Sequence, residues 1–144
     1  FINACPENTD ICLPLISKEA YLDKFPSAEA LFVKLTDGSW TIGCAFMVKV
    51  AAFTKARPHI DQVFQRRKSK LGMARLLGLK FVTKWLLGRI SVKDIEAKIT
   101  DLIGCTGRPI YGCEPELGYD VDYIDDYQYA TQYLQTQKRV PIHH

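Results

Sequence analysis

The chain of 144 residues has the length of one domain, with an apolar content of 47% and a charged content of 24% that are ordinary for a globular protein. This composition excludes wholesale disorder, and no apolar run reaches the roughly 20 residues of a membrane span, so we expect no membrane partner. The net charge of +3 is too small to indicate a polyanion, so nucleic acid is not the expected ligand.

The first third of the chain predicts short strands around a hairpin. The predicted elements are a strand over 10–17, a short helix or loop over 18–24, a strand over 30–35 and a strand over 40–50. Asp37-Gly38 is a typical hairpin turn between the last two strands. Gly43, inside the second of these strands, indicates either a bulge or a site of close approach.

The rest of the chain is predicted to be mainly helical. The predicted elements are a helix over 58–67 entered at Pro58, a helix over 70–87, a helix over 91–103, a strand over 107–111 and a final helix after residue 122. Ser91 and Asp94 form a capping box, and Gly104 ends that helix. This order predicts one domain of the α/β or α+β class over 1–140, with 141–144 as a tail of tag-like character.

Five cysteines form an odd number and include no C-x-x-C pair. This pattern argues against a disulfide framework and a structural zinc site, and it is typical of the reducing cytoplasm, where we expect the protein to be located. Two pairings stay open, Cys5 with Cys12 and Cys105 with Cys113. We expect no signal peptide, because the chain opens at Phe1 without Met or a charged segment.

Charge is segregated along the chain. Residues 114–126 carry six acids and no base, whereas 55–98 carry twelve Lys and Arg against three acids, including the basic run 66–70. Carboxylates just before a helix suit a divalent cation, and a basic cluster suits phosphate. Together the two segments predict metal-assisted nucleotide chemistry.

Asp120 and Asp122 are the candidate metal ligands. They flank Val121, so in extended backbone their side chains share one face, and Mg²⁺ takes one or two carboxylates together with waters and substrate phosphates. The alternative is that Asp122 caps the last helix while Asp125 and Asp126 favour its dipole. Both can hold, with Asp122 capping and Asp120 facing a ligand.

Two further groups are candidates for substrate contact. Arg67 and Lys68 in the basic run could hold phosphate, or they could form a solvated surface. Gly43 could let a ligand approach the backbone, where Cys44 would contact it. Cys44 has no neighbouring base, so it is not expected to be a nucleophile. The tryptophans and the tyrosines from 123 onward are expected to pack.

Read in order, these segments resemble the C-terminal half of the NTP-transferase family related to molybdenum-cofactor guanylyltransferase. The resemblance runs from about residue 10 to residue 134 and depends on the order and spacing of its segments. They are Phe25-Pro26, Asp37-Gly38, Thr41-Ile42-Gly43-Cys44, Arg67-Lys68-Ser69, Leu76-Leu77-Gly78 and Gly118-Tyr119-Asp120-Val121-Asp122. Cys44 stands where the family often has Asn.

The resemblance implies a partial Rossmann-like mixed sheet with helices and Mg²⁺-dependent transfer of NMP from an NTP to a phosphorylated or cofactor acceptor. Asp120 and Asp122 would be the catalytic and metal-binding residues. The family's nucleotide-binding half has no counterpart here, so we expect the acceptor-side half of a longer enzyme, inactive alone. By the same resemblance, the residues that bind the acceptor are Arg67, Lys68, Gly43 and Cys44.

Two other functions stay open. A non-catalytic module could use the basic helices between 55 and 98 on nucleic acid or another anionic partner. The second function is that of a regulatory domain that has lost catalysis. The sequence does not distinguish the nucleotide, the acceptor or the oligomeric state.

Overall fold

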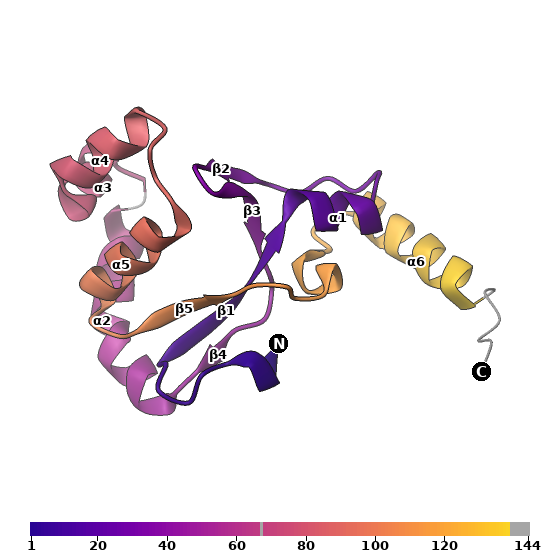
Figure 1. The fold of residues 1–144 in the computed structure, drawn as a ribbon, viewed down its shortest axis with the longest axis horizontal. Helices are drawn as coiled ribbons and strands as arrows, with labels where there is room; N and C mark the ends of the chain where they lie inside the picture. Colours follow the sequence, from indigo (N-terminus) through magenta and orange to yellow (C-terminus); the bar gives the residue numbers. More distant parts are fainter. Residues whose placement is uncertain (67, 139–144) are drawn as a thin grey trace.

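Strand β1 (Ile11–Ser17) is the centre of a mixed sheet in the computed structural model, which describes residues 1–66 and 68–138 (Figure 1). Within this part the sheet has five strands, accompanied by six α-helices, which confirms the predicted mixed α/β class. β3 and β4 pair antiparallel with β1, whereas β5 pairs parallel with it. The other strands are β2 (Val33–Leu35), β3 (Gly38–Ile42), β4 (Met47–Val48) and β5 (Gly107–Ile110).

Pro14 lies in the middle of β1, opposite a gap in the neighbouring strand. Its carbonyl accepts a hydrogen bond from the Gly43 N–H at 2.9 Å, but its ring nitrogen has no proton to donate. A central strand tolerates proline only where a ladder bond is dispensable, and here the partner is interrupted between β3 and β4. The continuous strand predicted over 40–50 is therefore wrong.

The hairpin predicted at Asp37-Gly38 is confirmed. It joins β2 to β3, and Gly38 has a φ of 141°, which favours glycine. The Asp37 carboxylate accepts a hydrogen bond from the Val92 N–H at 3.0 Å. The tip of the hairpin is thereby fixed to the first turn of α5 (Val92–Ile103).

Four helices form one unit beside the sheet, called the helical block below: α2 (Val50–Arg66), α3 (Lys70–Leu77), α4 (Leu79–Leu86) and α5 (Val92–Ile103). The capping box of Ser91 and Asp94 at the start of α5 is confirmed, as is the end at Gly104, which adopts the left-handed conformation. These signals are local, so the sequence predicts them well.

Two helix predictions are wrong. α2 does not begin at Pro58, which lies inside it, because the first half of α2 buries Ala52 and Ala56 against Cys105. That packing outweighs the hydrogen bond that proline removes. The helix predicted over 70–87 is two helices, separated by Gly78 with a φ of 83°. This conformation stops α3 and lets α4 leave in a new direction.

Aromatic side chains form the core at the other end of the sheet. Phe25, which follows α1 (Lys18–Lys24), packs with buried Tyr21, and its ring centroid lies 5.0 Å from that of Tyr133 in α6 (Ile124–Lys138). The 3₁₀ turn η2 (Pro115–Gly118) leads into this cluster. The short 3₁₀ helix η1 (Ile2–Ala4) precedes β1. The five cysteines are all free, so neither open pairing forms.

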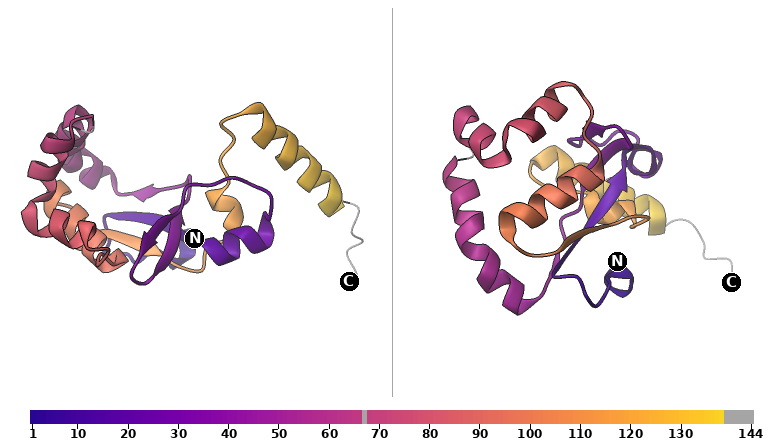
Figure 2. Two further views of the ribbon diagram at one scale, coloured as in Figure 1. Left: turned by 90° about the horizontal axis from the view of Figure 1, so that it is seen from above. Right: turned by 60° about the vertical axis from the view of Figure 1, so that its left-hand side comes forward.

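The molecule is open in shape. The helical block lies at one end, α6 at the other, and the sheet between them (Figures 1 and 2). A compact monomer of 16.4 kDa is expected to expose roughly 7,500 Å², whereas this chain exposes 10,736 Å². No helix in the described ranges is both long and apolar enough to cross a bilayer. Much apolar surface therefore stays uncovered.

Candidate functional site

The end of β3 meets the turn that precedes the acidic segment. The Cys44 N–H donates a hydrogen bond of 2.7 Å to the Leu117 carbonyl, next to the bond from Gly43 to Pro14. We use the name Cys44–Leu117 junction for Gly43, Cys44 and the segment 117–122. It brings together four of the predicted site residues: Gly43, Cys44, Asp120 and Asp122.

Gly43 is buried, and this chain itself fills the space beside it. A Cβ at this position would lie 2.4 Å from Cγ of Pro14 and 2.7 Å from the Leu117 carbonyl oxygen. The close approach expected at Gly43 is thus made by the backbone of η2. Contact between Gly43 and an acceptor stays a prediction.

Gly118 sets the path of the acidic segment. A Cβ on Gly118 would lie 2.6 Å from Cδ1 of Ile16, so a larger residue here would displace the end of that buried side chain. The next residue, Tyr119, places its ring centroid 5.0 Å from that of Phe25 and donates its hydroxyl proton to the Asp126 carbonyl at 2.9 Å. The segment between Tyr119 and Asp126 is therefore fastened at both ends.

Asp126, not Asp122, satisfies the backbone before α6. Its Oδ2 accepts hydrogen bonds from the N–H groups of Tyr123 at 2.9 Å and Asp122 at 3.2 Å. The helix begins at Ile124, so Asp122 lies too early in the chain to be its cap. The predicted capping role of Asp122 is wrong. Its exposed carboxylate makes no hydrogen bond or ion pair with the residues that the structure describes.

Asp120 is also exposed, and its Oδ1 accepts a hydrogen bond from the Val121 N–H at 3.0 Å. Partial desolvation of the sulfur raises the pKa of Cys44, and the carboxylates of Asp120 and Asp122 raise it further. The three side chains thus share one local field, which is negative. A raised pKa keeps the thiol protonated at neutral pH, and this disfavours a nucleophilic role for Cys44.

A hollow of about 700 Å³ adjoins the junction. Its carboxylates are Glu114 and Glu116, and Ala45 and Leu117 contribute to its wall beside η1. Glu116 forms an ion pair of 2.9 Å with Lys24, and the hydrogen bond from Lys24 lowers the pKa of this carboxyl. Glu116 is therefore paired, and Glu114 is the hollow's other carboxylate.

A magnesium site at Asp120 and Asp122 stays a prediction. Within the described ranges, no group of three or more His, Cys, Asp or Glu side chains is arranged to hold a metal ion. Asp120 and Asp122 offer two carboxylates, the number that Mg²⁺ takes when water and substrate phosphates fill its other positions. A dedicated protein cage is not needed for such an ion.

The basic run lies elsewhere. Lys68 is exposed in the turn between α2 and α3, within the helical block, whereas the junction leads into α6 at the opposite end (Figure 1). The neighbouring Ser69 caps α3 by accepting a hydrogen bond of 3.0 Å from the Gly72 N–H. Arg67 lies outside the described residues. The structure does not bring Lys68 to the junction.

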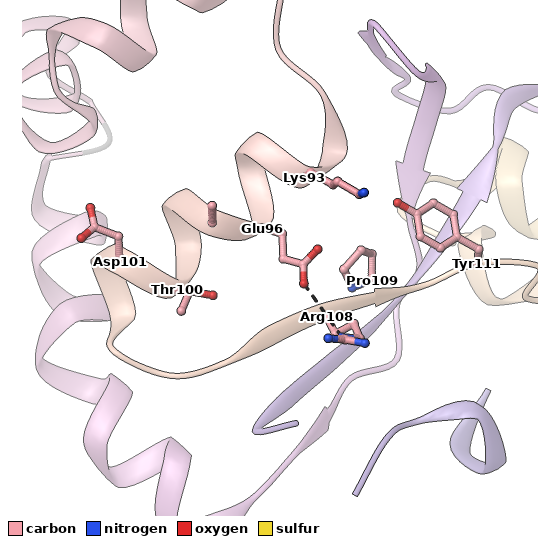
Figure 3. A pocket seen from close by; sticks show the side chains of 8 residues that line it. Lys93, Glu96, Thr100, Asp101, Arg108, Pro109 and Tyr111 are labelled. Atoms are coloured by element: carbon pink, nitrogen blue, oxygen red, sulfur yellow. Dashed lines mark ion pairs between the residues drawn. The ribbon is translucent and has the colours of Figure 1, made fainter. Parts of the chain in front are cut away.

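A second groove, of about 850 Å³, lies between α5 and β5 (Figure 3). Glu96 reaches from α5 toward Arg108 in β5, with 4.0 Å between Oε1 and Nε. None of the predicted site residues lines this groove. The signal that could have indicated it is a set of polar residues on one helix face beside a charged strand residue: Lys93, Glu96, Thr100 and Arg108.

No protein-family model matches the chain, and no curated protein does. Among solved structures, a hypothetical transferase from Thermus thermophilus is similar, with a TM-score of 0.77 and 33% sequence identity. The match covers 87% of this chain and 54% of the other, so this chain spans about half the length of that protein. The similarity supports a transferase-like fold.

Proposed function

We propose that this chain is the acceptor-side half of a Mg²⁺-dependent nucleotidyltransferase that moves NMP from an NTP to a phosphorylated or cofactor acceptor. The observation that carries the proposal is the Cys44–Leu117 junction, where Gly43 and Cys44 meet the segment of Asp120 and Asp122. The similarity to a longer hypothetical transferase, of which the match covers 54%, supports it.

In this proposal each residue at the junction has a separate task. Asp120 and Asp122 hold Mg²⁺ on their exposed side, and the hydrogen bonds of Asp126 keep that segment in place. Bound magnesium would neutralise charge on the phosphates of both substrates. Cys44, kept neutral by its raised pKa, borders the acceptor without repelling its phosphate. Contact of Arg67 and Lys68 with that phosphate stays a prediction.

Paramagnetic Mn²⁺, a substitute for Mg²⁺, tests the metal site directly. In amide NMR spectra of the chain, substoichiometric Mn²⁺ is expected to broaden the signals of Cys44, Val121 and Asp122 first. Asp120→Asn combined with Asp122→Asn should abolish this selectivity. Asp125→Asn is the matched control, because Asp125 is an exposed carboxylate of the same segment. Broadening centred on Glu96 and Asp101 instead would contradict the proposal.

The reaction itself is tested by pyrophosphate release. The chain alone is expected to release none from any NTP. A longer protein that carries this chain and a nucleotide-binding half should release pyrophosphate when Mg²⁺ and a phosphorylated acceptor are present. The Asp120→Asn variant should lower that rate by 10²-fold or so, since one group that acts on charge in the transition state typically contributes about that much. An unchanged rate would remove Asp120 from the site.

A further inference from the structure

Helices α3 and α4 carry large apolar side chains on their outer surface. Leu79 and Leu86 are 79% and 81% exposed, and the neighbouring Trp85 is 61% exposed. α4 has no buried residue at all. Leu71 in α3 and Leu87 after α4 are exposed as well. We call this region, from Ser69 to Leu87, the α3–α4 face.

The apolar residues of α4 lie on one side of the helix. Leu79 and Leu86 are seven positions apart, two helical turns, so they share one face, and Val82 lies between them. Lys80 and Lys84 lie on the other side of the helix, and Lys84 pairs there with Asp94 of α5. On the apolar side Phe81 and Val82 are half-buried. Leu79, Trp85 and Leu86 stay exposed in the described part of the chain.

The charge around this face has one sign. Residues 62–93 contain nine Lys and Arg and no acid. Lys84 pairs with Asp94 of α5, which holds α4 on the helical block. In contrast, Arg75, Lys80 and Arg89 lie within 4.0 Å of no carboxylate in the part that the structure describes. Their charge is available to an anionic partner.

Three kinds of partner could cover such a face, and its chemistry separates them. A second copy in a symmetric contact would bring two cationic segments together, which is unfavourable. Nucleic acid would satisfy the cations but would leave Leu79 and Leu86 in water, because aliphatic side chains do not stack on bases. An anionic bilayer would bind both the cationic and the apolar side chains, since its headgroups attract Lys and Arg while Leu and Trp insert at the boundary of its acyl chains.

We propose that the α3–α4 face docks this protein on the surface of a membrane that contains anionic phospholipid. The two short helices lie in the plane of the interface, with Leu79 and Leu86 below the headgroups and Trp85 at their level. The Cys44–Leu117 junction leads into α6, which lies at the end of the molecule opposite the helical block, so this docking leaves the junction in water (Figure 1). This docking goes beyond the proposed transferase activity and does not depend on it.

Vesicle binding tests the docking. The chain is expected to sediment with vesicles that contain about 30% phosphatidylserine in phosphatidylcholine, and to remain in solution with phosphatidylcholine alone. Trp85 emission should shift to shorter wavelength on binding. Higher salt should weaken binding, because the cations are exposed.

Two sets of variants test its two components. Leu79→Gln combined with Leu86→Gln should weaken binding tenfold or more, since about 25 cal/mol is lost for each Å² of apolar surface left in water. Arg75→Gln and Lys80→Gln should each weaken it about fivefold. Leu31→Gln is the apolar control, because Leu31 is 85% exposed outside the helical block, and Lys34→Gln is the cationic control. Circular dichroism checks that each variant folds.

Four results would overturn the proposal. The first is no sedimentation with anionic vesicles at low salt. The second is equal loss of binding in the Leu31→Gln control, which would indicate general apolar adhesion. The third is a dimer in analytical ultracentrifugation that Leu79→Gln and Leu86→Gln dissociate. The fourth is tight binding to duplex DNA that these changes do not affect. Either of the last two would assign the face to another partner.

Discussion

The Cys44–Leu117 junction and the α3–α4 face differ in what holds their side chains. At the junction, backbone hydrogen bonds and close packing around two glycines leave little freedom, and the exposed groups are two carboxylates. At the α3–α4 face the largest apolar residues are exposed and the surrounding charge is positive. The junction has the rigidity that a binding site for small ligands needs. The face has the properties of a surface that another phase or molecule covers.

The largest expected difference in stability is between the variants Phe25→Ala and Trp85→Ala. Phe25 is 3% exposed and its ring contacts those of Tyr21, Tyr119 and Tyr133, so Phe25→Ala should lower the free energy of unfolding by about 3–5 kcal/mol. Trp85→Ala should lower it by less than about 1 kcal/mol, because the side chain is largely in water already. Urea denaturation followed by circular dichroism measures both. Equal losses would show that α4 is packed more tightly than described.

Glycine substitutions examine the rigidity of the junction. Gly43→Ala should destabilise the fold by about 1–3 kcal/mol, because the Leu117 carbonyl cannot move away without breaking its bond to Cys44. Gly107→Ala is the control. A Cβ there would meet Ile99 Cγ2 at 3.7 Å, an ordinary contact, so the change should be near neutral. Thermal unfolding of the two variants gives the comparison.

Signals close together in the sequence predicted the fold well. The capping box of Ser91 and Asp94, the hairpin at Asp37-Gly38 and the strand β5 are each defined by a few adjacent residues, and the structure confirms them. The acidic segment also stood out from sequence alone. Its place beside Cys44 did not follow from spacing and came only from the resemblance to a family.

Errors arose where a distant contact decides the outcome. Local sequence predicts a helix start at Pro58 because the packing of Ala52 and Ala56 on Cys105 is not visible in it. It predicts Asp122 as the cap, and not Asp126, because the first residue of α6 depends on where Tyr119 is anchored. The expectation that Trp85, Tyr123 and Tyr127 pack is wrong as well, since their side chains are 61%, 77% and 60% exposed. The surroundings of Trp85 depend on how α4 turns at Gly78.

Removing the cap of α6 should have a moderate effect. Asp126→Ala deletes the acceptor for two N–H groups before the helix, which should lower the free energy of unfolding by about 1 kcal/mol. Asp122→Ala should leave it within about 0.5 kcal/mol, since that side chain is exposed and accepts no bond in the described part. Chemical denaturation distinguishes them. The reverse order would restore Asp122 as the cap.

The smallest effect is expected from a pH titration at the helical block. Hydrogen bonds from Lys84 and Ser91 lower the pKa of Asp94 from 3.8 to about 2 in the folded chain. Because the folded value is the lower one, ionised Asp94 stabilises the fold above its unfolded pKa, and this contribution disappears as the pH falls from 3.8 toward 2.

Asp94→Asn should therefore make unfolding less dependent on pH in that interval, and it should lower the free energy of unfolding modestly at neutral pH, where the contribution of the ionised carboxylate is fully present but screened by solvent. Asp101→Asn is the matched control, a carboxylate of the same helix paired with Lys98 and 71% exposed. Urea denaturation at a series of pH values measures both slopes. If Asp94→Asn left the acid slope unchanged, Lys84 would not hold α4 on α5 through Asp94.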